Sequence, residues 1–152
     1  MLTLLSSGVL SEPTLTVSPW LEERRAEYYD ALLRVSTHGD WDTFLAFFSQ
    51  GLAAAATSTR HQMLALAAAH QSLKETVRSS SLRSAHALDL VDFAVANPSF
   101  TVRKVEAALG ISYGRANGLV AQLTDIGVLD VVETGSQPRR FAAPAVLKVL
   151  LT

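Results

Sequence analysis

Polar side chains that can read base pairs lie close together between residues 112 and 122 of this 152-residue chain. Arg115 can donate two hydrogen bonds to the edge of guanine, and the amides of Asn117 and Gln122 can pair with the edge of adenine. Nearer the C-terminus, Arg139 and Arg140 form a cationic pair suited to phosphates or the minor groove. These residue types predict a contact surface for DNA. Its predicted residues are Ser112, Tyr113, Arg115, Asn117, Gln122, Arg139 and Arg140.

A helix-turn-helix is the element predicted to hold the first of these side chains. Apolar residues recur at helical spacing before and after a break at Gly110, and Ser112 can cap the second helix. Gly127 is suited to end that helix. The apolar positions are Val102, Val105, Ala108 and Leu109 in the first helix, and Ala116, Leu119, Val120, Leu123 and Ile126 in the second. The polar side chains between them are left to face outward.

A β-hairpin is predicted to follow and to carry the arginine pair. Residues 128–132 have strand-like content, residues 135–138 read Gly-Ser-Gln-Pro and are typical of a turn, and residues 139–142 return on the second strand. An earlier helix begins at Leu82 and ends near Asn97-Pro98. Together these elements predict a winged helix-turn-helix domain over residues 82–152.

The first 80 residues are predicted to form a separate helical segment. After a lead-in that buries Leu15 and Val17, one helix covers Trp20–Val35, a turn follows at His38-Gly39, and Asp40 caps the next helix. Two apolar stripes follow: Trp41, Phe44, Leu45, Phe48, Leu52 and Ala55, then Met63, Leu66, His70, Leu73 and Val77. A polar junction of three serines separates this segment from the winged helix. The predicted fold class is mainly α with one small β-hairpin.

Composition indicates the cellular compartment of the protein and how strongly its charges can attract nucleic acid. The chain has no cysteine, no apolar run approaching the roughly 20 residues of a membrane span, and no basic flank typical of a signal peptide, so we expect a cytoplasmic protein. The part up to Ser81 carries six basic and eight acidic residues, and the rest carries seven and six. Neither part has the excess of positive charge that strong nonspecific binding of nucleic acid requires.

Catalytic and metal-binding patterns are weak in this chain. The four histidines include no i,i+4 pair and have no cysteine beside them, so no metal site is predicted. The acidic residues between 22 and 30 alternate with arginines and are expected to form ion pairs on a solvated helix face. Gly110, Gly114 and Gly118 follow no strand, unlike the glycines of a phosphate-binding loop. We therefore predict no catalytic residue, metal or cofactor.

The run from Leu15 to Gly51 contains Arg-x-x-Tyr-Tyr, Gly-Asp-Trp and Phe-Phe in this order. This order resembles the segment that follows the catalytic core in proteins of the Fic-domain (filamentation induced by cAMP) family. Many such proteins continue into a winged helix whose second helix begins Ser-Tyr-x-x-Ala-Asn. The matching residues are Ser18, Pro19, Trp20, Arg25, Tyr28, Tyr29, Gly39, Asp40, Trp41, Phe47 and Phe48, with Ser112, Tyr113, Ala116 and Asn117 in the winged helix. The resemblance covers nearly the whole chain.

The resemblance implies a chain without the family's activity. Fic enzymes transfer AMP from ATP to a protein hydroxyl through a His-x-Phe-x-(Asp/Glu)-Gly-Asn-(Gly/Lys)-Arg motif, in which the histidine is the general base. That motif is absent here, and in the family it lies upstream of the segment that matches Leu15 onward. The chain is thus expected to be a non-catalytic C-terminal portion, with Met1 either the edge of a fragment or an alternative start. In a full-length parent it would pack on the Fic catalytic core.

Two functions from different classes follow from these observations. One is a regulatory or targeting portion of a Fic-family protein whose winged helix binds DNA. The alternative is a free-standing winged-helix transcription regulator with a helical dimerisation domain, or a winged helix used for protein–protein contact. In either case the apolar stripes of the helical half are expected to pair two copies into a homodimer.

Overall fold

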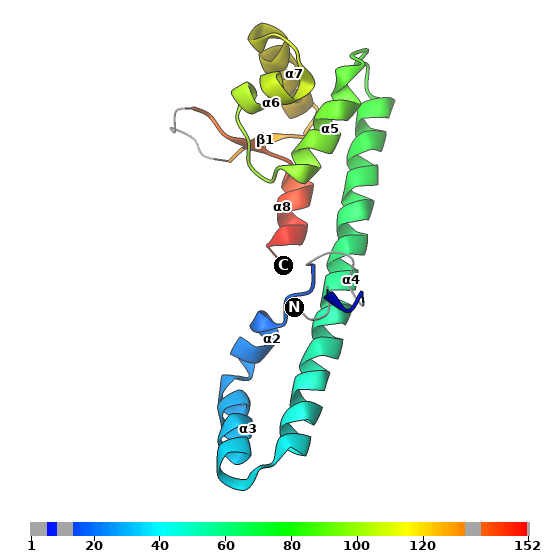
Figure 1. Cartoon of the computed structure of the whole chain (residues 1–152). Coiled ribbons are helices and arrows are strands. Elements are labelled where there is room, and N and C mark those ends of the chain that lie inside the picture. Colours follow the sequence, from blue (N-terminus) through cyan, green and yellow to red (C-terminus); the bar gives the residue numbers. More distant parts are fainter. Residues whose placement is uncertain (1–5, 9–13, 133–137, 152) are drawn as a thin grey trace. The chain divides into compact units, whose positions relative to one another are not determined.

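The computed structural model describes residues 6–8, 14–132 and 138–151, and it is mainly helical with one small antiparallel sheet, as predicted (Figure 1). The chain forms two compact units, Met1–Met63 and Leu64–Thr152. The division falls inside the long helix α4, Trp41–Ser79, whereas the predicted domains meet at the serine junction where this helix ends. The second unit begins upstream of that junction because the last turns of α4 supply Leu73 and Val77 to its core.

The first unit has two helices where a single one was predicted from Trp20 onward. Helix α2 spans Ser18–Glu23 and helix α3 spans Arg25–His38. The prediction was wrong because the backbone leaves helical geometry at Arg24, whose amide donates to the carbonyl of Leu21 at 3.2 Å. The break brings the Arg24 guanidinium within 4.6 Å of the centre of the Trp20 ring.

A short turn joins α3 to α4, as predicted. Gly39 has a φ of 69°, a left-handed conformation that glycine adopts without steric cost. The Asp40 carboxylate then caps α4 by accepting hydrogen bonds from the Thr43 amide at 3.2 Å and the Thr43 hydroxyl at 2.9 Å. The Arg34 guanidinium lies 2.6 Å away. The Thr43 hydrogen bonds, followed by the charge of Arg34, lower the pKa of Asp40 below its ordinary value.

The core of the first unit is small. Among its described residues the buried apolar ones are Leu15, Ala31 and Ala55, and Val17 is half-buried. Helix α4 faces α2 and α3 through Phe47, whose ring centre lies 4.9 Å from that of Trp20 and 6.5 Å from that of Tyr28. Trp41 and Leu45 of the first predicted stripe stay exposed within the chain, because the row of Phe47 makes the contact with α2 and α3.

The second unit begins with the last part of α4 and the helix α5, His86–Ala96. In the second predicted stripe of α4, Leu73 and Val77 are buried and Leu66 and His70 are half-buried, but Met63 is exposed because it lies at the unit boundary, beyond the winged-helix core. The start of α5 at Leu82 was also predicted wrongly. The hydroxyl of Ser80 accepts a hydrogen bond from the Leu82 amide at 3.2 Å, which holds this segment in a turn before the helix begins.

Helices α6, Val102–Leu109, and α7, Tyr113–Asp125, form the predicted helix-turn-helix. Gly110 at the turn and Gly127 after α7 both have positive φ, as expected of glycines that end helices. The predicted apolar face of α7 is confirmed, because Ala116, Leu119, Val120 and Leu123 are buried and Ile126 is half-buried. In α6, Ala108 is exposed, contrary to prediction, because the inward row runs through Val102, Val105 and Leu109.

The wing is a short hairpin in which β1, Asp130–Val131, pairs antiparallel with β2, Phe141–Ala142. The strand predicted over residues 128–132 is shorter because Val128 and Leu129 turn into the core after α7. Phe100 extends the hairpin from the other side by exchanging hydrogen bonds of 3.0 and 2.8 Å with the backbone of Phe141. The predicted turn at residues 135–138 lies outside the described residues except for Pro138.

Helix α8, Pro144–Leu150, follows the wing, and its Val146 is fully buried. The core of the second unit joins α4, α5, α6, α7, α8 and the wing. Its largest fully buried side chains are Phe100, Leu90, Leu123, Leu129, Val91, Val105, Val120, Val128 and Val146. Within the described ranges, no helix combines the length and apolar character needed to cross a membrane.

Candidate nucleic-acid interface

Helix α7 buries one face and exposes the face that carries the predicted base-reading residues. Its apolar residues recur at spacings of three and four, so the core takes one side of the helix and leaves Arg115, Asn117 and Gln122 exposed. Ser112 and Tyr113 are exposed at its start. Ser112 occupies the predicted N-cap position in an extended conformation, although its hydroxyl makes no capping hydrogen bond to any described residue.

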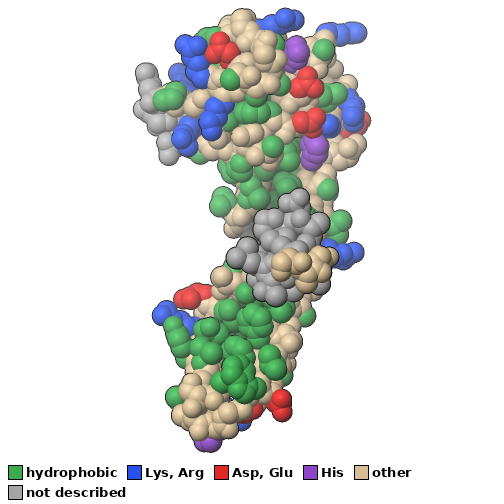
Figure 2. All heavy atoms as spheres, viewed as in Figure 1, with side chains coloured by type: hydrophobic (Ala, Val, Ile, Leu, Met, Phe, Trp, Pro, Cys, Tyr) green, Lys and Arg blue, Asp and Glu red, His purple; other side chains and the backbone are tan. Residues whose placement is uncertain are grey.

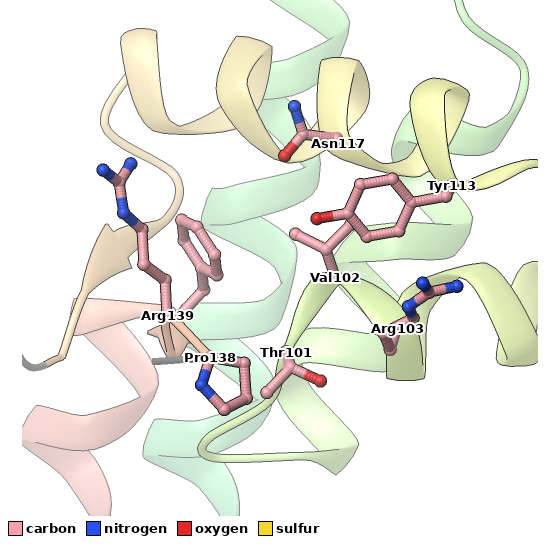
Figure 3. A pocket seen from close by; sticks show the side chains of 8 residues that line it. Thr101, Val102, Arg103, Tyr113, Asn117, Pro138 and Arg139 are labelled. Carbon is pink, nitrogen blue, oxygen red and sulfur yellow. The ribbon is translucent and has the colours of Figure 1, made fainter. Parts of the chain in front are cut away.

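Two grooves divide these residues between opposite flanks of α7. Tyr113 and Asn117 line a groove of about 410 Å³ on the side of the wing (Figure 3). Arg115 and Gln122 line a second groove of about 340 Å³, whose other wall includes His86 at the start of α5. The structure therefore does not bring the three base-reading side chains together in one row.

The outward strip of α7 at Gly114, Gly118 and Ala121, which we call the ridge, has almost no side chains, and its two glycines also line the second groove. Gly114 and Gly118 lie one turn apart, and a methyl group added to either would meet no other atom within 4 Å. Ala121 continues the ridge and is exposed. A partner surface can therefore approach the backbone of α7 closely along this ridge, with longer side chains on either side.

The groove beside the wing is lined by hydrogen-bond donors. Its wall includes the hydroxyls of Thr101 and Tyr113, the Asn117 amide and the guanidinium groups of Arg103 and Arg139 (Figure 3). Thr101 is the N-cap residue of α6, so the positive end of that helix also opens here. The complete lining is Thr101, Val102, Arg103, Tyr113, Asn117, Pro138, Arg139 and Phe141. This described lining contains no carboxylate, so the groove is suited to an anion.

Arg103 lies at the edge of this groove, where its side chain contacts Tyr113 and Glu106. Its guanidinium lies 4.8 Å from the centre of the Tyr113 ring and donates a hydrogen bond of 3.1 Å to Glu106. The predicted set of contact residues does not include Thr101 or Arg103, which also line this groove. Both residues stand at the N-terminus of α6, the first helix of the helix-turn-helix. Backbone amides in the first turn of a helix are free to bind anions, so their position in the sequence could have indicated this role.

Arg139 and Arg140 were predicted to lie on the second wing strand, but that strand begins at Phe141. Both arginines are exposed just before it. The backbone pairing nevertheless reaches this point, because the Arg140 carbonyl accepts a hydrogen bond of 2.9 Å from the Val132 amide. The side chains are therefore carried by a hydrogen-bonded part of the hairpin, and Arg139 extends over the groove toward α7 (Figure 3).

Several described cations on this side of the second unit form no ion pair with another described residue. Among the described residues, Lys104, Arg115, Arg139 and Arg140 are exposed and form no ion pair, whereas Arg103 is paired with Glu106. Figure 2 shows Lys and Arg side chains around α6, α7 and the wing. Unpaired surface cations are the groups that can exchange counterions for phosphates.

A cluster of one aspartate, one histidine and one lysine lies where α4 meets α5. Asp92 accepts a hydrogen bond from His70 at 2.5 Å and one from Lys74 at 2.7 Å, which ties the two helices together. The hydrogen bond from Lys74, ahead of the one from His70, lowers the pKa of Asp92 below its ordinary value. These groups are paired with each other, and within the described ranges no three His, Asp or Glu side chains are placed to hold a metal ion.

A search against models of known protein families finds no match to this chain. The resemblance to Fic-domain proteins therefore remains a prediction from the residues quoted above.

Proposed function

We propose that the winged-helix unit binds double-stranded DNA, with α7 in the major groove and the wing along the phosphate backbone. The observation that carries this proposal is that the exposed face of α7, with its polar side chains, lies next to a groove beside the wing that is lined by hydrogen-bond donors. Thr101, Tyr113 and Arg139 line that groove and are suited to a phosphate, because hydroxyl and guanidinium groups are the usual partners of phosphate oxygens.

The two flanks of α7 would then contact different parts of the site. The bare ridge at Gly114 and Gly118 lets the helix backbone lie close to the base edges. Arg115 and Gln122 would read bases on one flank, and Asn117 would read a base on the flank nearer the wing. Because few of the described cations are both exposed and unpaired, we expect modest affinity that is lost in moderate salt.

In its cellular role, the chain would be the regulatory or targeting portion of a Fic-like protein rather than an enzyme. The Fic motif with its general base is absent from the sequence, and we expect no transfer of labelled AMP to lysate proteins. Labelling by a highly purified sample would contradict this part of the proposal. A free-standing winged-helix transcription regulator remains the alternative.

A second function, contact with another protein, is favoured by one observation. The ridge at Gly114, Gly118 and Ala121 is uncharged and carries no large side chain, and small residues on a helix permit close packing against another helix. Under this alternative, Gly118→Leu would abolish partner binding, while Arg139→Ala would leave it unchanged.

DNA binding is tested by fluorescence anisotropy with genomic fragments at low and moderate salt. Arg115→Ala should cost about 1–3 kcal/mol on a selected site and relax its specificity at one position. Arg139→Ala with Arg140→Ala should weaken all sequences alike and reduce the salt slope by about two, roughly one for each phosphate contact. Arg60→Ala, which removes an exposed arginine from α4, is the matched control and should change nothing. Absence of binding at tens of micromolar protein would refute the proposal.

A further inference from the structure

The first unit exposes a continuous apolar face that its own small core leaves uncovered. The side chains of Tyr29, Leu33, Trp41 and Leu45 are 55%, 60%, 58% and 54% exposed. Figure 2 shows hydrophobic side chains gathered over α3 and α4. We call this surface the α3–α4 face, and it consists of Tyr29, Leu33, Trp41 and Leu45 with the half-buried Phe44, Phe48 and Leu52.

Helix geometry places these residues on one side of the α3–α4 pair. Tyr29 directly follows Tyr28, and Phe48 directly follows Phe47, and the rings of Tyr28 and Phe47 meet between the two helices. In two antiparallel helices, the residue after each inward-facing position turns to the same side of the pair. The aromatic contacts are continuous along α4, because the ring centres of Trp41 and Phe44 are 6.2 Å apart and those of Phe44 and Phe48 are 6.0 Å apart.

The described part of the first unit buries few apolar side chains. Of the described apolar residues, three are buried in the first unit, against nineteen in the second. Burial of apolar surface is what offsets the conformational entropy lost on folding, so further burial of the exposed apolar side chains would stabilise this unit. The α3–α4 face is the apolar surface on this unit that can supply the missing contacts.

We propose that the occupant of the α3–α4 face is a second copy of this chain, packed by a two-fold axis into a four-helix arrangement. The four most exposed side chains offer roughly 400–500 Å² of apolar surface, taking about 150–250 Å² for each whole aromatic residue. A standard dimer buries about 800 Å² per partner, of which about three-fifths is apolar. The area of the face therefore matches the apolar part of one dimer interface.

Charges at the two ends of the face fit a two-fold axis. Arg25 lies at one end, with its guanidinium 5.7 Å from the centre of the Tyr29 ring, and Asp42 follows Trp41 at the other end. Among the described residues Asp42 has no ion-pair partner. A two-fold axis through the middle of the face brings Arg25 of each copy toward Asp42 of the other. The face itself contains no charged residue, so pairing leaves no charge buried and unpaired.

The experiment compares two neighbouring substitutions on α4, measured by sedimentation equilibrium in the absence of DNA. Leu45→Glu places a charge in the centre of the face and should raise the dimer dissociation constant by at least about 100-fold, because each copy loses a buried leucine. Ala46→Glu introduces the same charge one position further, outside the face, and should leave the dimer intact. Far-UV circular dichroism establishes that both variants keep their helices.

Cysteine cross-linking identifies the surface that pairs. The natural chain has no cysteine, so Leu45→Cys should form a disulfide-linked dimer under mild oxidation and Ala46→Cys should not. Arg25→Asp should weaken the dimer, and adding Asp42→Arg should restore it. A wild-type chain that is monomeric across micromolar concentrations would overturn the proposal. A dimer that is indifferent to Leu45→Glu and gives no Leu45→Cys cross-link would overturn it as well, whatever the outcome of the DNA-binding tests.

Discussion

Replacing Gly51 by alanine tests the packing of α2 on α4. A methyl group at this position would lie 2.7 Å from Cε3 and 2.8 Å from Cζ3 of Trp20. These distances are well inside van der Waals contact, so the indole must move. It has little freedom to do so, because its ring centre lies 4.9 Å from that of Phe47 and 4.6 Å from the Arg24 guanidinium.

Two opposing effects set the size of the change. Alanine is favoured over glycine inside a helix by about 0.5–1 kcal/mol. Overpacking a filled site costs typically about 1–3 kcal/mol. We therefore expect Gly51→Ala to lower the free energy of unfolding by about 0.5–2 kcal/mol. Trp20→Phe removes the two clashing carbons, so in this background Gly51→Ala should become neutral or stabilising.

The assay follows denaturant unfolding through the far-UV circular dichroism signal of the helices, because the two variants with Trp20→Phe lack the tryptophan whose fluorescence would otherwise report on this contact. The four variants of Gly51 and Trp20 form a double-mutant cycle, which isolates their coupling free energy. We expect Gly51→Ala to be less destabilising with phenylalanine at position 20 than with Trp20, by about 1 kcal/mol or more. If Gly51→Ala stabilises the protein equally with Trp20 and with phenylalanine, then Trp20 does not pack on Gly51 and the reasoning fails.

Three further outcomes follow from the second unit. Gly114→Ala should raise the free energy of unfolding of the second unit by up to about 1 kcal/mol, because alanine is favoured in a helix and the added methyl meets no atom within 4 Å. Thermal unfolding followed by far-UV circular dichroism measures this change. Phe100→Ala should cost about 3–5 kcal/mol, because Phe100 is fully buried between Phe93 and Phe141, and a denaturation midpoint near that of wild type would contradict this. Asp92 has a lowered pKa when folded, so its contribution to stability is complete above about pH 4 and is lost as the pH falls through the folded pKa. Asp92→Asn should therefore flatten the fall in stability below pH 4, and an unchanged acid transition would count against the contact with Lys74.

The sequence alone predicted most of the second unit, because its signals are local. Gly110 and Gly127 end helices through their own backbone freedom, and the apolar residues of α7 repeat at the spacing of one helix face. These properties depend on residues within one or two turns of each other. The cap of α4 at Asp40 was predictable for the same reason, since its partner Thr43 is three residues away.

Tertiary structure decided which apolar rows are covered and how the candidate site is divided. Trp41 and Leu45 have the same helical spacing as buried residues, and they are exposed because α3 meets α4 along the row of Phe47. Pairing between Phe100 and Phe141 joins residues far apart in the chain, so no local pattern showed it. Arg115 and Asn117 are neighbours in sequence, but the positions of α5 and the wing place them in separate grooves. Spacing along a helix determines which side chains share a face, whereas the elements packed around that helix determine what the face can bind.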